Sequence, residues 1–181
     1  MVCIRHERPS DHPSVEELLD RAFGIRRRLR TSYRYRIGLE PVRALCFVAE
    51  EGNRLVGAIR YWRLRLGPRL ALLLGPLAIE PQLRGRGIGA RLVEVSLARA
   101  TAVGEDLVFL VGDPAYYARF GFCPAPPEVV MPGEDPARLL LRRLASDSPP
   151  PAGVLLRADT PLLPVVRERA AAGGEAAVPL S

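Results

Sequence analysis

The hydrophobic residues of this chain fall into short runs separated by turn-forming residues, a pattern that predicts a sheet of several strands. Residues 55–66 are predicted to form a strand, because their last side chains alternate between apolar residues and arginines. Residues 45–49, which precede the turn EEGNR, are predicted to be its hairpin partner. Residues 70–79 are almost continuously apolar, which favours a central strand covered on both faces. Further strands are predicted at residues 2–5, 107–111, 139–144 and 154–157.

Pro76 lies inside the predicted central strand. Because proline has no N–H to donate to a neighbouring strand, a bulge or local splay is expected near Gly75 and Pro76. Splaying leaves backbone N–H and C=O groups without partners, and such groups are then exposed to a ligand.

Helical spacing of apolar residues is found in three segments. The first contains Ser14 and Glu17, which form a capping box, and Gly24 is expected to end it. The other two helices are expected from Ile88 to a stop at Gly104, and over residues 114–120 between Asp113 as cap and Gly121 as stop. Together with the strands, they predict an α/β (α+β) fold.

The chain has 181 residues, of which 48% are hydrophobic, so it is long enough for one sizeable core. We expect a single domain over residues 1–158, followed by a tail at 159–181 that is either a short helix or disordered. No apolar run approaches the roughly 20 residues that cross a bilayer, and the N-terminus has no signal-peptide core, which indicates a cytoplasmic protein. The three separate cysteines argue against a disulfide framework and against a metal site.

All 26 basic residues are arginines, and the net charge is +6. Without lysine, the chain has neither a Walker-type phosphate loop nor a Schiff base. His6 and His12 are the only histidines, and there is no GxSxG elbow, so a serine or cysteine hydrolase with a histidine base is disfavoured. An enzyme of this composition works with few titrating side chains.

The segment IRRRLRTSYRYR, residues 25–36, is strongly basic and carries two tyrosines. Such a segment is compatible with nucleic-acid binding, but no RNP, KH or helix-turn-helix pattern accompanies it, so nucleic acid is disfavoured. It is otherwise a solvated surface or a segment that faces the substrate, and we favour the last of these.

The stretch RGRGIGARL places Gly85, Gly87 and Gly89 between a strand and a helix. The first amides of a helix lack partners and carry the positive end of its dipole, and glycine lets a ligand approach them closely. A phosphate-bearing ligand is therefore expected at this turn.

Two other interpretations of the same glycines remain open. Gly85, Gly87 and Ala90 also fit the dinucleotide fingerprint, with Glu105 at the distance of a ribose contact. That fingerprint directly follows the first strand of a βαβ unit, whereas here several strands and four further residues come first. The remaining alternative is a glycine-rich turn with no ligand.

Two motifs in this order resemble the GCN5-related N-acetyltransferases (GNAT). Arg84-x-x-Gly87-x-Gly89 matches their (Q/R)xxGx(G/A) motif, and GDPAYYARFGF contains their Tyr-x-x-x-Gly-Phe element. The chain is most similar to the YhbS-like branch, over roughly residues 4–124. The resemblance implies a mixed, mostly antiparallel sheet that splays between its fourth and fifth strands and is flanked by helices.

The resemblance also implies transfer of an acetyl group from acetyl-CoA to a primary amine by direct attack in a ternary complex, without a metal. It assigns the pyrophosphate to the backbone amides of Arg84, Gly85, Arg86, Gly87, Ile88, Gly89 and Ala90. It assigns the pantetheine arm to the backbone of Leu77, Ala78 and Ile79. A monomer or a homodimer is expected, and the amine acceptor is left open.

Two side chains are candidates for catalysis. The spacing to Gly121 and Phe122 in the motif selects Tyr117, rather than Tyr116, as the acid that protonates the departing thiolate. Glu80, at the end of the central strand, is the candidate base, although it is equally an ordinary exposed strand-end residue. An alternative function is a non-catalytic acyl-CoA-binding module or sensor; the presence of Tyr117 favours the enzyme.

Overall fold

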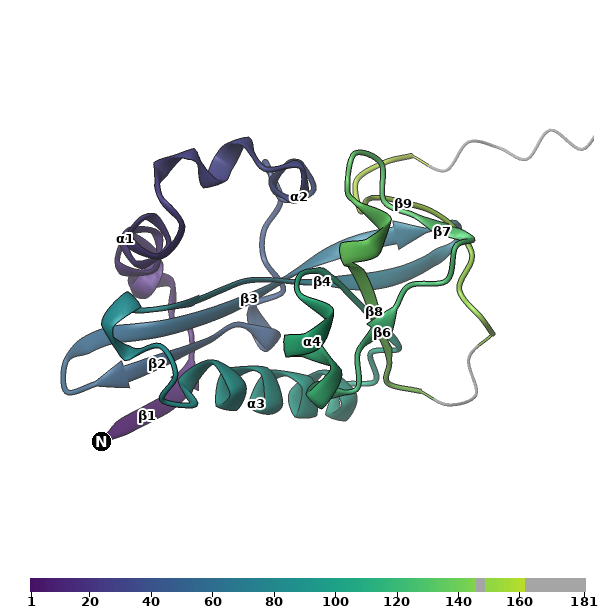
Figure 1. The fold of residues 1–181 in the computed structure, drawn as a ribbon. Helices are drawn as coiled ribbons and strands as arrows, with labels where there is room; N and C mark the ends of the chain where they lie inside the picture. Colours follow the sequence, from purple (N-terminus) through teal and green to yellow (C-terminus); the bar gives the residue numbers. More distant parts are fainter. Residues whose placement is uncertain (146–148, 162–181) are drawn as a thin grey trace, which may run out of the picture.

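The computed structural model describes residues 1–145 and 149–161, and within them the chain forms one sheet flanked by helices (Figure 1). The strands are β1 (Val2–His6), β2 (Phe47–Glu51), β3 (Arg54–Leu66), β4 (Arg69–Ile79), β5 (Leu107–Val111), β6 (Cys123–Pro124), β7 (Val129–Val130), β8 (Leu139–Arg143) and β9 (Gly153–Arg157). The helices are α1 (His12–Phe23), α2 (Thr31–Arg34), α3 (Ile88–Ala102) and α4 (Pro114–Tyr117). Every strand expected from the hydrophobic pattern is present.

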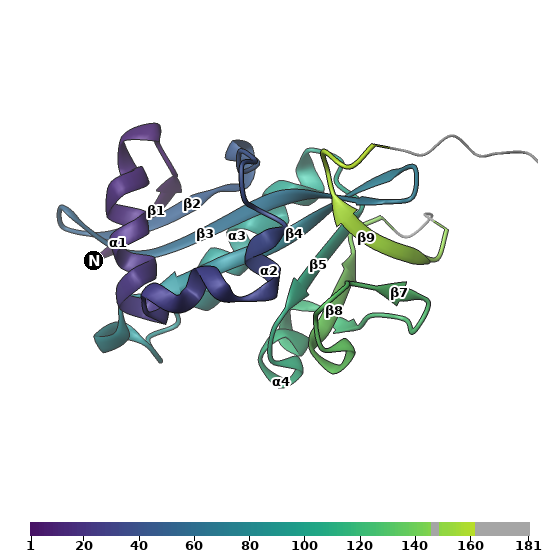
Figure 2. The same cartoon turned by 90° about the horizontal axis from the view of Figure 1, so that it is seen from above.

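The main path of the sheet runs β1-β2-β3-β4-β5-β8-β6, and β9 pairs with the far end of β3. Along this path all neighbours are antiparallel except β4 and β5, which confirms the mixed, mostly antiparallel sheet. The parallel pair is short, because only Leu72 and Leu73 of β4 are paired with β5. Beyond them the two strands diverge, as Figure 2 shows, so the predicted splay between the fourth and fifth strands is confirmed.

The bulge expected at Pro76 is also present. Ile59 of β3 is paired with Leu77, but Tyr61 is paired with Leu74, so the single residue Arg60 spans Gly75 and Pro76 on the neighbouring strand. A proline is tolerated at this place because the interrupted register does not need its missing N–H.

Helices cover both faces of the sheet (Figure 1). On one face α1 buries Val15, Leu18 and Leu19 against Val48 and Ala58. On the other face α3 buries a second apolar stripe against β2 and β3. That stripe and its partners include Leu92, Val93, Leu97, Ala49, Ile59 and Tyr61. Neighbouring residues of β3 thus point to opposite cores, as the pleat of a strand requires.

The first helix begins earlier than the capping box predicted. It starts at His12, so Ser14 lies inside it, and a 3-10 turn at Pro9–Asp11 precedes it. The Asp11 carboxylate accepts the backbone N–H of Arg8 at 2.7 Å and is paired with the guanidinium of Arg5 at 2.7 Å. These contacts cap the 3-10 turn, whereas Asp11, the N-cap of α1, makes no side-chain hydrogen bond to that helix. The prediction of Ser14 as the cap was wrong, because the helix has already begun at His12.

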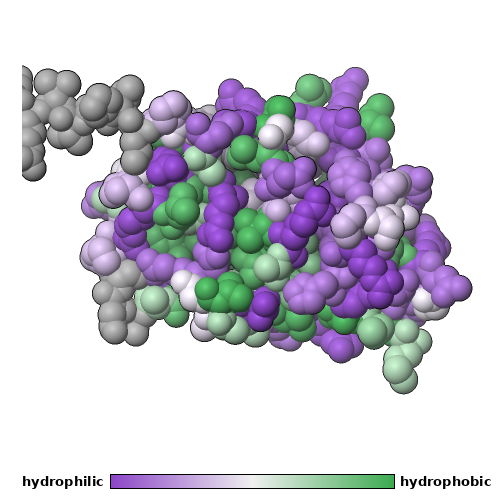
Figure 3. Space-filling view, turned by 180° about the vertical axis from the view of Figure 1, so that it is seen from behind, coloured by the Kyte–Doolittle hydropathy of each residue, from purple (hydrophilic) through white to green (hydrophobic). Residues whose placement is uncertain are grey.

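The predicted domain end at residue 158 falls just after β9. The predicted tail, residues 159–181, lies outside the described residues except for its first three positions, and it stays a prediction. Among the described helices, none has the length and apolar character that a membrane span requires. The face opposite to that of Figure 1 mixes hydrophilic side chains with smaller hydrophobic patches (Figure 3).

Candidate functional site

The glycine-rich turn connects β4 to α3 through a 3-10 turn at Pro81–Leu83. Gly85 and Gly87 have φ angles of 81° and 78°, in the left-handed region that side chains disfavour, and Gly87 is the N-cap of α3. A Cβ at either position would meet no atom within 4 Å, so the space above the turn is open. The Arg84 guanidinium anchors the turn by donating to the carbonyl oxygen of Ala22, at 2.9 Å.

A cavity of about 500 Å³ lies over this turn, and we call it the glycine-turn cavity. Its walls are half-buried side chains at the end of β4, the first turn of α3, the end of α1, and Tyr116 and Arg119 from α4 and the 3-10 turn after it. Its lining includes Leu77, Ile79, Gly85, Gly87, Gly89, Ala90, Phe23 and Tyr116. A Cβ on Gly89 would lie 3.1 Å from the Tyr116 hydroxyl, so glycine keeps this passage open.

The edge of β4 that faces β5 is unpaired after Leu73 within the described residues. The opposite edge stays paired with β3 as far as Ile79. Leu77 and Ile79 line the glycine-turn cavity, whereas the Ala78 side chain is buried beneath α1. The predicted pantetheine segment therefore has a free strand edge beside a cavity, which is the arrangement needed to add an extended ligand as an extra strand.

Tyr116 and Tyr117 lie on the short helix expected between Asp113 and Gly121. The Asp113 carboxylate accepts the N–H of Ala115 at 3.0 Å, and Gly121 ends the following 3-10 turn with a φ of 76°. Asp113 thus serves as a helix cap. The two tyrosine rings meet edge to face, 4.9 Å apart, and as predicted they point into different surroundings.

Tyr117 is held by close packing. Its ring lies against the rings of Phe120 and Phe122, and a Cβ on Gly112 would come within 2.6 Å of it. Burial raises the pKa of the Tyr117 hydroxyl, and the neighbouring Tyr116 adds to the shift. A raised pKa keeps the phenol protonated at neutral pH, as a general acid requires.

Tyr117 lines a second cavity of about 210 Å³, which we call the arginine-lined cavity. It shares Phe23 and Leu77 with the glycine-turn cavity, so the two cavities adjoin at the splay. Its other walls come from the start of the β4 bulge and from the basic segment at residues 25–36. Four arginines line it: Arg27, Arg30, Arg36 and Arg138.

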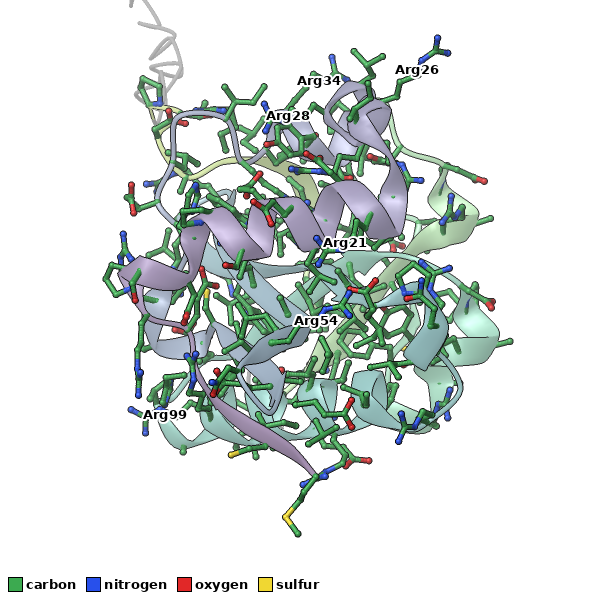
Figure 4. The ribbon with its side chains drawn as sticks, turned by 90° about the vertical axis from the view of Figure 1, so that its left-hand side faces the viewer. Arg21, Arg26, Arg28, Arg34, Arg54 and Arg99 are labelled. Carbon is green, nitrogen blue, oxygen red and sulfur yellow. The ribbon has the colours of Figure 1, made fainter. Side chains whose placement is uncertain are left out.

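The structure does not bring Glu80 and Tyr117 into one cavity, since Glu80 lines neither of the two. The Glu80 side chain is 4% exposed, and its Oε2 lies 3.2 Å from Arg21 of α1 and 3.1 Å from Arg54 of β3. Figure 4 shows these two arginines next to each other, beneath α1. The alternative of an ordinary exposed strand-end glutamate is therefore wrong. The base role of Glu80 stays a prediction, and these contacts do not support it.

The basic segment, which the sequence analysis favoured as facing the substrate, forms a wall of the arginine-lined cavity. Sequence reasoning missed Arg138, which precedes β8 and reaches the same cavity. No pattern around Arg138 distinguished it from the other arginines of the chain. Within residues 1–145 and 149–161 there is no cluster of three His, Cys, Asp or Glu side chains that could hold a metal ion.

Comparison with known proteins places the chain in a family. A family model described as an acetyltransferase (GNAT) domain matches residues 43–124. The uncharacterized N-acetyltransferase YjhQ of Escherichia coli K12 is 31% identical over 121 residues, which are 64% of this chain and 66% of YjhQ. The uncharacterized N-acetyltransferase YhbS of the same strain is 30% identical over 123 residues, 67% of this chain and 73% of YhbS.

Solved structures agree with the sequence comparison. YhbS from Escherichia coli, in complex with CoA, is similar with a TM-score of 0.74 and 26% identity, over 85% of this chain and 88% of YhbS. A GNAT family acetyltransferase from Brucella melitensis, in complex with acetyl-CoA, is similar with a TM-score of 0.66 and 25% identity, over 88% and 97% of the two chains. From its fold, its two motifs and these relatives, the chain belongs to the GNAT family of acetyltransferases.

Proposed function

We propose that this protein binds acetyl-CoA in the glycine-turn cavity and transfers the acetyl group to a primary amine that enters through the arginine-lined cavity. The observation that carries the proposal is the position of Tyr117 in the arginine-lined cavity, which adjoins the glycine-turn cavity at Phe23 and Leu77, beside the free edge of β4. The two similar structures that are complexes with CoA and acetyl-CoA support the same ligand here.

In this proposal the ligand is held mainly by backbone groups. The amides from Arg84 to Ala90 bind the pyrophosphate at the positive end of the α3 dipole. The backbone of Leu77, Ala78 and Ile79 pairs with the pantetheine arm, and one of its N–H groups polarises the thioester carbonyl. Apolar side chains of the cavity cover the arm.

The chemistry forms a C–N bond and breaks the C–S bond of the thioester. The neutral amine attacks the carbonyl carbon, the C–S bond breaks, and Tyr117 donates its proton to the departing sulfur. The proton that the nitrogen loses as the amide forms passes to solvent, and solvent returns a proton to the Tyr117 oxygen. An alkyl amine with a pKa near 10.4 is almost entirely protonated at pH 7, so releasing its proton costs roughly 4 to 5 kcal/mol. The site must lower this cost.

We propose that the four arginines of the arginine-lined cavity lower part of the cost of deprotonating the amine. None of the described residues that line the arginine-lined cavity is Asp, Glu or His. Positive charges within a few ångströms disfavour an ammonium ion and lower its pKa, so a larger fraction of the bound amine is neutral. Solvent in the open mouth of the cavity then takes the proton. In this account Glu80 holds α1 to the sheet through its two arginines.

Replacing Glu80 by glutamine distinguishes a structural role of this side chain, holding α1 to the sheet, from the role of general base. Because the carboxylate is buried against two guanidinium groups, we expect the free energy of unfolding to fall by about 1 to 3 kcal/mol, with kcat little changed. Urea unfolding and steady-state kinetics measure the two effects, and Glu94→Gln on the exposed face of α3 is the control. A tenfold or larger fall in kcat with unchanged stability would make Glu80 the base.

Thermal unfolding in the presence of ligands tests the function as a whole. A ligand at 100 times its Kd stabilises the folded state by about 2.7 kcal/mol, which corresponds to a rise in Tm of about 5 to 10 °C for a chain of this size. We expect this rise with acetyl-CoA and none with NADH. The reverse result would favour the dinucleotide interpretation, and a rise without turnover on any amine would favour an acyl-CoA sensor.

A further inference from the structure

The arginine-lined cavity has an unusual charge balance. All four of its charged side chains are cationic, and its remaining polar lining consists of Ser32, Tyr33 and Tyr117. A cavity that receives an ammonium ion would be expected to contain a carboxylate. The charge of this cavity is suited instead to a ligand that carries a negative group.

Three of these four arginines form no ion pair with an acidic side chain of the described residues, although Glu134 lies near enough to act on the charge of Arg36. Arg27 is paired with Glu16 at 2.5 Å and with Asp20 at 2.7 Å, so its charge is balanced. Among the described residues, no ion pair joins an acidic side chain to the other three, Arg30, Arg36 and Arg138. Arg30 lies over the ring of Phe23, and Arg30 and Arg138 are exposed at the mouth.

Arg36 is half-buried in the wall of the arginine-lined cavity. Its Nη2 lies 3.2 Å from the place of a Cβ on Gly75, beside the β4 bulge, and its Nε is buried without a hydrogen-bond partner in the described structure. Burial lowers the pKa of Arg36 to about 10, although the charge of Glu134 acts in the opposite direction. The guanidinium is therefore charged at neutral pH and incompletely compensated.

A second buried donor lies nearby. The hollow next to the arginine-lined cavity shares Arg27, Tyr33, Arg36 and Pro76 with it, and Trp62 forms part of its wall. Within the described residues, the indole Nε1 of Trp62 is also buried without a partner. Both unpaired donors border this hollow, whose lining also includes Glu16, and of the two only Arg36 also lines the arginine-lined cavity. Leaving a buried donor unpaired is costly, and an anionic group in the arginine-lined cavity would be stabilised by the Arg36 guanidinium.

We propose that the amine acceptor is a small molecule that also carries a carboxylate or phosphate group, with this anion bound by Arg36 and supported by Arg30 and Arg138. The inference rests on the proposed function and adds the substrate class. The anion would occupy the arginine end of the cavity, and the amine would point toward Tyr117 and the thioester. A volume of about 210 Å³ suits an acceptor of amino-acid size.

Matched amines that differ in one charged group test the proposal. We would measure kcat/KM for 4-aminobutyrate against butylamine, and for phosphoethanolamine against ethanolamine, with putrescine as a dication. The anionic member of at least one pair is expected to exceed its neutral partner by about tenfold or more, and putrescine to be the poorest substrate. The two pairs distinguish a carboxylate from a phosphate.

Arginine variants locate the effect. Arg36→Gln is expected to reduce the anionic preference to within about threefold by raising KM for the anionic amine, since the bidentate donor is lost. Arg26→Gln is the control, because Arg26 belongs to the same basic segment but points away from the molecule (Figure 4). If Arg36→Gln does not fold, the exposed Arg138→Gln carries the same test with a partial loss of preference.

The outcomes separate the two proposals. A kcat/KM for the neutral amines or putrescine that equals the kcat/KM for the anionic amines would overturn this inference. It would leave the acetyltransferase function intact. An unchanged preference in folded Arg36→Gln and Arg138→Gln would overturn the assignment to these arginines. If acetyl-CoA has no effect on Tm, the proposed function is contradicted. If acetyl-CoA raises Tm but none of these amines is acetylated, the inference about the acceptor is overturned.

Discussion

Replacing Tyr117 by phenylalanine is expected to lower kcat by about 10²- to 10⁴-fold, while the Kd for acetyl-CoA changes little. The substitution removes the hydroxyl that protonates the departing thiolate and keeps the ring that packs against Phe120 and Phe122. A thiol with a pKa near 8.5 leaves readily even without an acid, so the lower end of this range is expected. Steady-state kinetics and calorimetric binding of acetyl-CoA measure the two quantities.

Tyr116→Phe is the matched control for this substitution. Tyr116 precedes Tyr117 on α4, but its hydroxyl lies beside Gly89 in the glycine-turn cavity. Its loss should alter acetyl-CoA affinity slightly and leave kcat nearly unchanged. Equal small losses from both variants would mean that solvent protonates the thiolate. A large loss from Tyr116→Phe alone would move the acid to the preceding residue.

Gly87→Glu is expected to abolish measurable binding of acetyl-CoA. Gly87 is the N-cap of α3, and the space above it is open to the glycine-turn cavity. A glutamate there would place bulk and negative charge where the pyrophosphate is expected, and its carboxylate would occupy the positive end of the helix dipole. Isothermal titration calorimetry with acetyl-CoA measures the loss.

Gly87→Gln controls for strain and size. Any side chain at a φ of 78° is strained by about 1 to 2 kcal/mol, and glutamine carries that cost without the charge. The glutamine variant should therefore bind more weakly than the wild type but better than the glutamate variant. Tight binding by a folded Gly87→Glu protein would show that the pyrophosphate lies elsewhere.

The parts of the site that were predicted from the sequence depend on local patterns. The turn at Gly85 and Gly87 was predictable because it depends only on the positive φ angles that glycine tolerates and on the helix that follows. The disturbance at Pro76 followed from a missing N–H, and the orientation of the two tyrosines followed from the spacing of adjacent residues on a helix. Each of these properties is set within a few residues along the chain.

The parts that were not predicted depend on contacts between distant segments. Glu80 was predicted to be either a base or an exposed strand-end residue, but α1 and the start of β3 bring Arg21 and Arg54 over it. Arg36 and Arg138 are far apart in the sequence and meet in one cavity only because the sheet splays between β4 and β5. In a chain whose basic residues are all arginine, composition alone does not distinguish these few from the others.

The central claim, that the splay carries an acetyl transfer from acetyl-CoA to an amine, is tested most directly by the release of CoA thiol in the presence and absence of an amine. The acetylated amine is identified by mass spectrometry in the same reaction. We expect thiol release that depends on the amine, matches the acetylated product in amount, and is lost in Gly87→Glu. Thiol release that is the same with and without each amine tested, with no acetylated product, would contradict the claim.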